Sequence, residues 1–445
     1  MTPMEQIQKR LLPDTDRELA DFIALFRAGE MPASESGMEQ HFRIAKQKPP
    51  AFYNHGAVLA LSFGGTNAKV MIASMRGGQM VVDYVRAEEN PEQHTDFYDY
   101  LDRLLIQDAA VHSYLSETAC PCIGISLPML IVEHCPYHPT KLPTFDRMVA
   151  RSKEEVCEEL VFEANFDRYM KSRGFPNYMM FYQSDGIVAH HGAVALSDVL
   201  ERDKTVLCIC GTGMANGDER HYLPIALVCN LPEDDALFPA EETENRQLNY
   251  AIAGKGVFGL MRRAAERVRL GGSALEGKPV ADFFTHSRDT RTVYELYQSG
   301  LDNGFDTVRL QKLREAVGEA GYAELIELAS AIAVRSYQTL ANTIVSTVVS
   351  MGPLENGGRN VIYLEGSIAR NPVIKPRIFE EIRRKMKNGL TYFDGTPVRA
   401  VLVEDPPLKE LVAGKTVAAD LKQVDTTLIG TATMAIAEDC VGKGI

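Results

Sequence analysis

The most constraining feature of this 445-residue sequence is a pattern that occurs twice, in which an apolar run typical of a β-strand breaks at a glycine turn. The first run, AVLALSF from Ala57, continues as GGTN and then as the apolar run AKVMIAS, whereas the second, TVLCIC from Thr205, ends in GTGMANG. Strand, glycine turn and strand together predict a hairpin. Because the two turns lie far apart in the chain, at Gly64 and Gly211, we expect two related lobes that each offer a hairpin to a shared cleft.

Strand and helix patterns alternate through the rest of the chain. Further strands are predicted in CIGISLPM, NYMMFYQ and NVIYL, and helices in RELADFIALFRAGE, residues 152–173, DGIVAHHGAVAL and residues 310–351. This alternation predicts an α/β protein. The expected organisation is a helical segment at 1–55 that packs on the large lobe, a small lobe at 56–190, a large lobe at 191–425 and a C-terminal helix at 426–445.

The overall charge excludes some kinds of partner. Lys and Arg number 47 against 60 Asp and Glu, so the formal charge is −13, and no basic run offers a face for nucleic acid. No apolar stretch reaches the roughly 20 residues of a membrane helix, and the start MTPMEQIQKR lacks the apolar core of a signal peptide. We therefore expect a cytoplasmic protein without nucleic-acid or membrane partners, and the oligomeric state stays open.

The eight cysteines are irregularly spread, which is typical of reduced thiols and not of a disulfide framework. One cluster offers donors for zinc: Cys120, Cys122, His134, Cys135 and His138. Its spacing matches none of the usual paired zinc patterns. We therefore favour a strand followed by a connecting loop, and we predict no metal site in the protein itself.

Both glycine turns suit the binding of a phosphate. Glycine lets a backbone approach a phosphate closely, and each turn adds a threonine hydroxyl, at Thr66 and at Thr212. Either turn alone also occurs in ordinary hairpins. Their joint occurrence, each after an apolar strand, favours phosphate binding.

Asp185 lies between the two turns, where the apolar strand NYMMFYQ ends and a helical pattern begins. Asp185 or Ser184 would make a good helix N-cap, and a carboxylate at this end of a strand also lies where ligands bind in α/β sheets. As a general base it could accept the proton of a substrate hydroxyl. His190 and His191 follow on the same helix, and we interpret them as surface or packing residues.

The order of these motifs resembles the hexokinase family. It comprises LALSFGGTNAKV, IGISLPM, PTKLPTFD, YQSDGIV, CICGTGMANG, YLEGS and a glycine near the C-terminus, and it spans nearly the whole chain. The resemblance implies a two-lobed, actin-like ATPase fold of the ribonuclease H type with a central ligand cleft. It also implies ATP-dependent phosphorylation of a hexose in carbohydrate metabolism such as glycolysis, with Mg2+ as the metal that accompanies ATP.

The family's functional residues carry over by position. The implied nucleotide-binding residues are Gly64, Gly65, Thr66, Asn67, Lys69, Gly211, Thr212, Gly213, Gly366, Ser367 and Gly430. The implied sugar-binding residues are Ser126, Thr140, Lys141, Ser184, Asp185, Asn216 and Glu233, and Asp185 is also the implied catalytic base. Lys69 stands where the family usually has arginine.

Several positions depart from the family pattern. Ser62 replaces an aspartate that helps to organise magnesium through water, and Ser184 replaces an asparagine. Asn216 is displaced from the hairpin position, Glu233 matches only with a shift, and Tyr250 falls where a second glutamate is usual. Two interpretations therefore stand: a kinase of a hexose or related polyol, or a weakly active or inactive regulatory protein that binds sugar or nucleotide. Actin-like assembly is a third interpretation that leaves the polar residues without a purpose.

Overall fold

The protein divides into two compact units in this computed structural model. The structure describes the chain apart from residues 1, 13, 29–33, 36–37, 65–66, 90–96, 128–129, 133–134, 138–160, 212, 224–251, 270–271, 303 and 415–419. Unit 1 comprises Met1–Ala33, Val206–Asp218 and Leu223–Asp405, and unit 2 comprises Ser34–Thr205, Glu219–Tyr222 and Pro406–Ile445. This division follows contacts between residues. The domain boundaries that the sequence motifs predict, at residues 55, 190 and 425, remain predictions.

Unit 2 contains a six-stranded sheet in the order β14-β4-β3-β2-β5-β8. Its strands are β2 (His55–Phe63), β3 (Asn67–Arg76), β4 (Gln79–Glu89), β5 (Cys122–Leu127), β8 (Met179–Ser184) and β14 (Val412–Ala413). β2 and β3 are antiparallel, which confirms the first predicted hairpin. β5 is parallel to β2, and β8 is parallel to β5, so the carboxyl ends of these three strands meet at one edge of the sheet.

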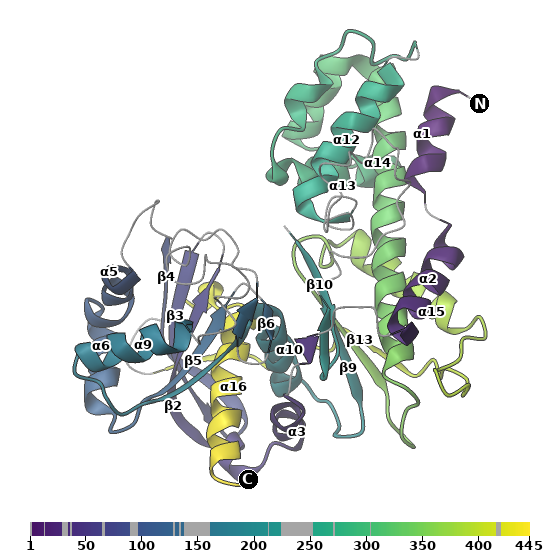
Figure 1. Cartoon of the computed structure of the whole chain (residues 1–445). Coiled ribbons are helices and arrows are strands. Elements are labelled where there is room, and N and C mark those ends of the chain that lie inside the picture. Colours follow the sequence, from purple (N-terminus) through teal and green to yellow (C-terminus); the bar gives the residue numbers. More distant parts are fainter. Residues whose placement is uncertain are drawn as a thin grey trace. The chain divides into compact units, whose positions relative to one another are not determined.

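Helices cover both faces of this sheet (Figure 1). Alternate residues such as Leu61 and Ile125 pack against one helical layer, which consists of α5 (Phe97–Leu101), the π-helical turn Asp102–Ile106, α6 (Ala109–Glu117) and α9 (Val161–Ser172). The opposite face contacts α16 (Thr426–Gly442), which also packs against α10 (Asp185–Leu196) and α3 (Glu39–Gln47). The short helix α4 (Pro50–Tyr53) leads into β2. Alternating burial of strand residues on two faces is what the apolar runs predict.

Glycines allow α16 to approach its neighbours closely. A Cβ atom added at Gly430 would lie 1.6 Å from the Val188 carbonyl oxygen of α10, and one added at Gly192 would lie 2.6 Å from the Gly430 nitrogen. On the sheet, a Cβ at Gly124 would lie 2.4 Å from the Thr431 carbonyl oxygen. Helix α16 therefore packs between β5 and α10 at distances that no larger residue permits.

His190 and His191 are buried in this packing, so of the two roles expected for them, surface or packing, the structure confirms packing. The Nε2 atom of His190 lies 2.7 Å from the Thr205 hydroxyl. His191 Nδ1 lies 2.9 Å from the Thr433 hydroxyl, and its Nε2 donates to the His41 carbonyl oxygen at 3.2 Å. Burial lowers the pKa of His191 to about 3, so this ring stays neutral at physiological pH.

Unit 1 combines strands with a large helical part. β9 (Lys204–Cys210) lies between β10 (Met214–Gly217) and β12 (Asn360–Glu365), and β12 pairs with β13 (Leu402–Glu404). β9 and β10 are antiparallel, which confirms the second predicted hairpin. The helices are α1 (Pro3–Leu11), α2 (Thr15–Ala28), α12 (Gly254–Arg269), α13 (Thr290–Leu301), α14 (Val308–Ser350) and α15 (Ile374–Met386). α14 bends at Gly318 and contacts α1, α2, α12, α13 and α15, so it forms the centre of this part (Figure 1).

The remaining elements are short. They are the ladders between β1 (Ser34–Glu35) and β11 (His221–Leu223) and between β6 (Leu130–Val132) and β7 (Cys135–Tyr137), and the 3-10 turns Val280–Phe283, Ser287–Asp289 and Leu421–Gln423. No helix in the described part of the chain is long and apolar enough to cross a membrane. The described residues also contain no group of three or more His, Cys, Asp or Glu that could hold a metal. His134 and His138 of the zinc alternative lie outside them, and the Cys122 thiol is buried 3.5 Å from the Ala435 carbonyl oxygen.

Candidate functional site

Four polar residues form a row across the sheet of unit 2. The strand registers place Lys69 opposite Ser62, Ser62 beside Ser126, and Ser126 beside Gln183. Directly paired residues of neighbouring strands point to the same face of a sheet. We call Lys69, Ser62, Ser126 and Gln183 the polar row. It lies near the carboxyl ends of β2, β5 and β8, where parallel strands usually present ligand-binding groups.

Hydrogen bonds organise the middle of the polar row. The Ser126 hydroxyl donates to the Ser62 hydroxyl at 2.9 Å, and both residues are buried. The Gln183 side-chain oxygen accepts the backbone N–H of Ser184 at 2.8 Å. Within the described residues the Ser184 hydroxyl has no hydrogen-bond partner, although only 1% of the residue is exposed. A buried hydroxyl of this kind can bond a ligand without first losing a protein contact.

Asp185 follows directly as the first residue of α10 and is partly buried. Burial raises the pKa of its carboxyl to about 6, the negative charge of Asp425 adds to the rise, and hydrogen bonds from the backbone amides of Gly186 and Asp185 oppose it. Above this pH Asp185 is a carboxylate with a higher proton affinity than an exposed aspartate. The strand end and the helix start together therefore place a suitable general base beside the polar row.

Lys69 is paired with a residue that the sequence analysis did not single out. Its ammonium group forms an ion pair with the Oδ2 atom of Asp425. Asp425 is also the N-cap of α16, because its Oδ1 atom accepts the backbone N–H of Leu428 at 2.9 Å. The sequence signal was the aspartate ahead of the apolar helical pattern TTLIGTATMAIA, which is typical of a helix start.

In unit 1, two of the predicted nucleotide-binding segments lie side by side. The Gly211 N–H donates to the Gly213 carbonyl at 2.9 Å, and the N–H of Gly254, the first residue of α12, donates to the Gly211 carbonyl at 2.7 Å. Gly366 has a φ of +88°, and a Cβ atom there would lie 2.4 Å from the Cys210 carbonyl oxygen. A Cβ at Gly211 would lie 3.7 Å from the Ser367 hydroxyl oxygen. A Cβ at Gly213, in contrast, would meet no atom of the described residues within 4 Å, so these residues leave space beside this turn.

Other predicted site residues have a visible role in the fold. The Gly64 N–H donates to the Asn67 carbonyl at 2.9 Å and so closes the first hairpin. Asn216 is fully buried and donates to the Thr343 carbonyl at 3.1 Å and the Thr347 hydroxyl at 2.5 Å, both on α14. Gly430 lies at the contact of α16 with α10. Their ligand contacts stay predictions, and Gly65, Thr66, Thr140, Lys141, Thr212 and Glu233 lie outside the described residues.

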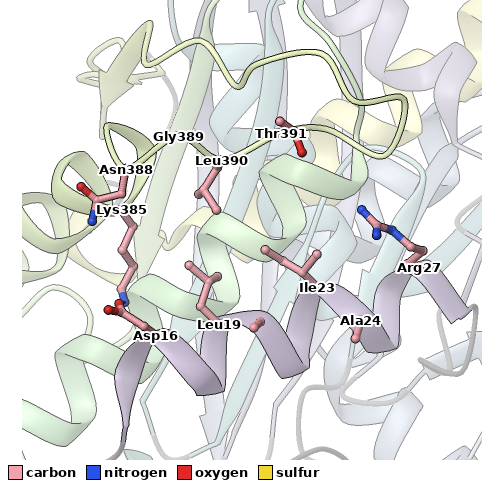
Figure 2. A pocket seen from close by; sticks show the side chains of 11 residues that line it. Asp16, Leu19, Ile23, Ala24, Arg27, Lys385, Asn388, Gly389, Leu390 and Thr391 are labelled. Carbon is pink, nitrogen blue, oxygen red and sulfur yellow. The ribbon is translucent and has the colours of Figure 1, made fainter.

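A separate pocket of about 470 Å³ lies in unit 1 between α2 and residues 385–391 (Figure 2). Leu19 and Ile23 of α2 point toward Leu390 across it. At one end Lys385 is buried and donates to the Thr15 hydroxyl at 2.7 Å, with Glu381 at 3.4 Å. None of the predicted site residues lines this pocket.

The two sheets, their hairpins and their helical layers define a class: the chain has the actin-like ATPase fold of the sugar kinases. This confirms the fold and the family resemblance that the motif order predicts. No protein-family model matches the sequence, and no curated protein matches it significantly.

The chain is similar to solved structures. A crystal structure of a hexokinase is similar over 98% of this chain and 98% of its own, with a TM-score of 0.68 and 14% identity. The hexokinase from Schistosoma mansoni, complexed with glucose, is similar over 98% of this chain and 99% of its own, with a TM-score of 0.54 and 12% identity. At these identities the likeness establishes the fold alone.

Proposed function

We propose that the protein transfers the γ-phosphoryl group of MgATP to a hydroxyl of a hexose or a related polyol. The observation that carries the proposal is the position of Asp185, at the start of α10 and the end of the polar row, with a pKa raised to about 6. In the reaction the sugar hydroxyl oxygen forms a bond to the γ-phosphorus of ATP. The bond between the γ-phosphorus and the β,γ-bridging oxygen breaks. Asp185 accepts the hydroxyl proton, and ADP leaves.

The glycine turns of unit 1 fit a nucleotide. The open space at Gly213 and the close contact of Gly366 with Cys210 make a turn where backbone can approach phosphate oxygens. Gly64 to Asn67, Lys69, Gly211 to Gly213, Gly366 and Ser367 are the proposed nucleotide contacts, whereas Gly430 is buried in the contact of α16 with α10 and is not retained among them. Magnesium neutralises phosphate charge when bound, and we propose that it enters with ATP because Mg2+ is usually held largely by the phosphates of its nucleotide.

The sugar would be held by hydroxyl, amide and charged groups. The Ser184 hydroxyl, which has no partner among the described residues, directly precedes Asp185. The buried Ser126 hydroxyl lies on the neighbouring strand β5, opposite Gln183. Thr140, Lys141 and Glu233 are the further contacts that we propose from the family resemblance, whereas the buried Asn216, bonded to α14, is not retained among them. A site of this composition suits a polyol, because each sugar hydroxyl both donates and accepts a hydrogen bond.

One observation supports the alternative, a regulatory protein that binds sugar or nucleotide with little turnover. Ser62 is bonded to Ser126, so this position of the polar row carries a neutral hydroxyl pair where the family has a carboxylate. Loss of a group that organises charge can lower turnover by orders of magnitude while binding is retained.

A panel of purified hexoses, amino sugars and polyols would test the proposal. ADP release would be measured with MgATP for the wild type and for Asp185→Asn, and sugar binding would be measured by calorimetry for both. If the protein is a kinase, the wild type releases ADP with at least one sugar, and Asp185→Asn does not. If the wild type binds a sugar or ATP but releases ADP with no member of the panel, the protein is the binding protein instead.

A further inference from the structure

A chain of hydrogen bonds in unit 2 joins helix α10 to the first residues of β9. The Thr205 hydroxyl donates to the Oε1 atom of Glu219 at 2.8 Å, and the Thr205 backbone N–H donates to the same oxygen at 3.1 Å. Because the one hydroxyl proton is engaged there, the hydroxyl oxygen accepts the Nε2–H of His190 on α10, at 2.7 Å. Thr205 therefore binds α10 on one side and Glu219 on the other.

Lys46 of α3 holds the other side of Glu219. Its ammonium nitrogen lies 2.6 Å from the same Oε1 atom, and it donates to the Asp203 carbonyl oxygen, just before β9, at 2.5 Å. Thr205 is fully buried and only 5% of the Lys46 side chain is exposed. We call His190, Thr205, Glu219 and Lys46 the root network.

The root network lies where the chain passes from unit 2 to unit 1 and back. The chain leaves unit 2 after Thr205 and returns to it at Glu219, and the residues between them include the hairpin of β9 and β10. Thr205 lies six residues before Gly211, which is about 20 Å along a strand. Because β9 is bonded to β10 on one side and to β12 on the other, it is a rigid element between the root network and the glycine turn.

The other end of the root network lies on the helix that begins with Asp185. His190 follows Asp185 by five residues, which is about 7.5 Å along the helix axis. A single buried hydroxyl thus connects the helix that begins with the proposed base to the strand that leads to the proposed phosphate turn.

We propose that Thr205 is a positioning residue for the phosphoryl transfer, whose hydroxyl fixes the start of β9 against α10. This inference rests on the proposed function. Burial alone does not require the hydroxyl, because valine has nearly the same shape, is favoured in strands and is often fully buried. The Lys46–Glu219 pair is weak evidence of stability as well, since apolar residues often replace buried ion pairs without loss. A fully satisfied, directional network instead allows one arrangement of the groups that it joins.

Two substitutions at Thr205 test this role. Thr205→Val removes the hydroxyl and keeps the shape, whereas Thr205→Ser keeps the hydroxyl. We expect kcat of Thr205→Val to fall about 10- to 100-fold, because a small displacement of a reacting group costs that much. The Kd values of ATP and of the sugar, from calorimetry, should change less than about twofold, because the ligand contacts themselves are kept. Thr205→Ser should recover most of the lost kcat.

Thr339→Val is the matched control. Thr339 is also fully buried and also donates to a glutamate, Glu18, at 3.2 Å, but it lies on α14 of unit 1. Its substitution should lower the melting temperature about as much as Thr205→Val does and leave kcat unchanged. If Thr205→Val keeps the kcat of the wild type, or if both valine variants lose kcat in step with stability, the Thr205 hydroxyl serves the fold alone and the inference is wrong.

Hydrogen exchange without ligands separates this inference from the proposed function. We expect the backbone amides of β9 and α10 to exchange about tenfold faster in Thr205→Val than in the wild type and Thr205→Ser, with no such change in Thr339→Val. If exchange changes in this way but the wild type phosphorylates no sugar, the connection between β9 and α10 is supported and the proposed function fails. Unchanged exchange in both elements would overturn the inference whatever the turnover.

Discussion

At the scale of single residues, the burial of Asp185 has two opposite consequences. It raises the pKa of the carboxyl to about 6, which makes the carboxylate a better proton acceptor. The same shift makes the ionised side chain costly for the fold. A carboxyl whose pKa is higher in the folded than in the unfolded state stabilises the fold at low pH, and this stability is lost as the pH rises through the folded pKa.

Asp185→Asn should therefore lose activity and gain stability. We expect turnover at pH 8 to fall at least about 100-fold, because the amide accepts no proton. The free energy of unfolding at pH 8 should rise by about 1 to 3 kcal/mol, because the ionised carboxylate is removed from a partly buried position. Urea unfolding measures the second effect, and the gain should vanish below about pH 4, where Asp185 is protonated in both states. A variant that is less stable at pH 8 would contradict this account.

Gly213 provides a test of the nucleotide turn that does not disturb the fold. A Cβ atom there meets nothing within 4 Å in the part of the chain that the structure describes, so Gly213→Ala should leave the melting temperature unchanged. If phosphate oxygens occupy that space, the added methyl group should weaken ATP binding about tenfold or more, as calorimetry would show. Unchanged ATP affinity would place the nucleotide elsewhere.

At the scale of elements, unit 2 depends on the contact between α10 and α16. Small residues at the contact let the two backbones touch, and the buried His191 bonds both Thr433 of α16 and the His41 carbonyl of α3. The base, the N-cap at Asp425 and the polar row all depend on this contact for their relative positions.

Gly430→Ala should disrupt that contact. The new methyl carbon would lie 1.6 Å from the Val188 carbonyl oxygen, so the helices must separate. We expect a loss of about 3 kcal/mol or more in the free energy of unfolding. The control is Gly442→Ala on the same helix, where the methyl group meets none of the described residues within 4 Å and the change should be neutral or slightly stabilising. Equal stability of the two variants would show that the helices are not in close contact.

The strands and helices could be predicted from the sequence better than the contacts between residues that lie far apart in the chain. Apolar runs bounded by glycine or by a helix cap indicated β2, β3, β5, β8 and α10, because local residues decide burial there. The Lys69–Asp425 pair joins residues 356 positions apart, and the Ser62–Ser126 bond depends on the register of parallel strands. The family resemblance implies a sugar contact for Asn216, displaced from the usual hairpin position, whereas in the structure its side chain points into the core against α14. Local patterns carry no information about such distant contacts.

At the scale of the whole molecule, the chain passes between the units at residues 33–34, 205–206, 218–219, 222–223 and 405–406. After the crossing at residues 405–406, β14 pairs with β4, and α16 packs on β2, β5 and α10. The Lys409 N–H also donates to the Leu196 carbonyl at 2.7 Å. Noncovalent contacts therefore hold the segment after residue 405 to the rest of unit 2.

A cut at residues 405–406 should consequently leave the protein assembled. With a protease site inserted there, both fragments should elute together from a sizing column under native conditions and separate in denaturant. Dissociation of the smaller fragment without denaturant would mean that the apolar face of α16 contributes little to stability.

The same arrangement has a consequence for biosynthesis. The strands and helix that α16 covers are complete once residue 205 has been made, but α16 itself begins only at Thr426. At about 5–20 residues per second, translation of the intervening chain takes roughly 10 to 45 s. During that time the nascent chain exposes the sheet face around Gly124 and the α10 surface around Val188, which α16 later covers. Chaperones that bind apolar surface would therefore meet this protein on the ribosome, and a ribosome that stalls before residue 426 would leave an aggregation-prone product.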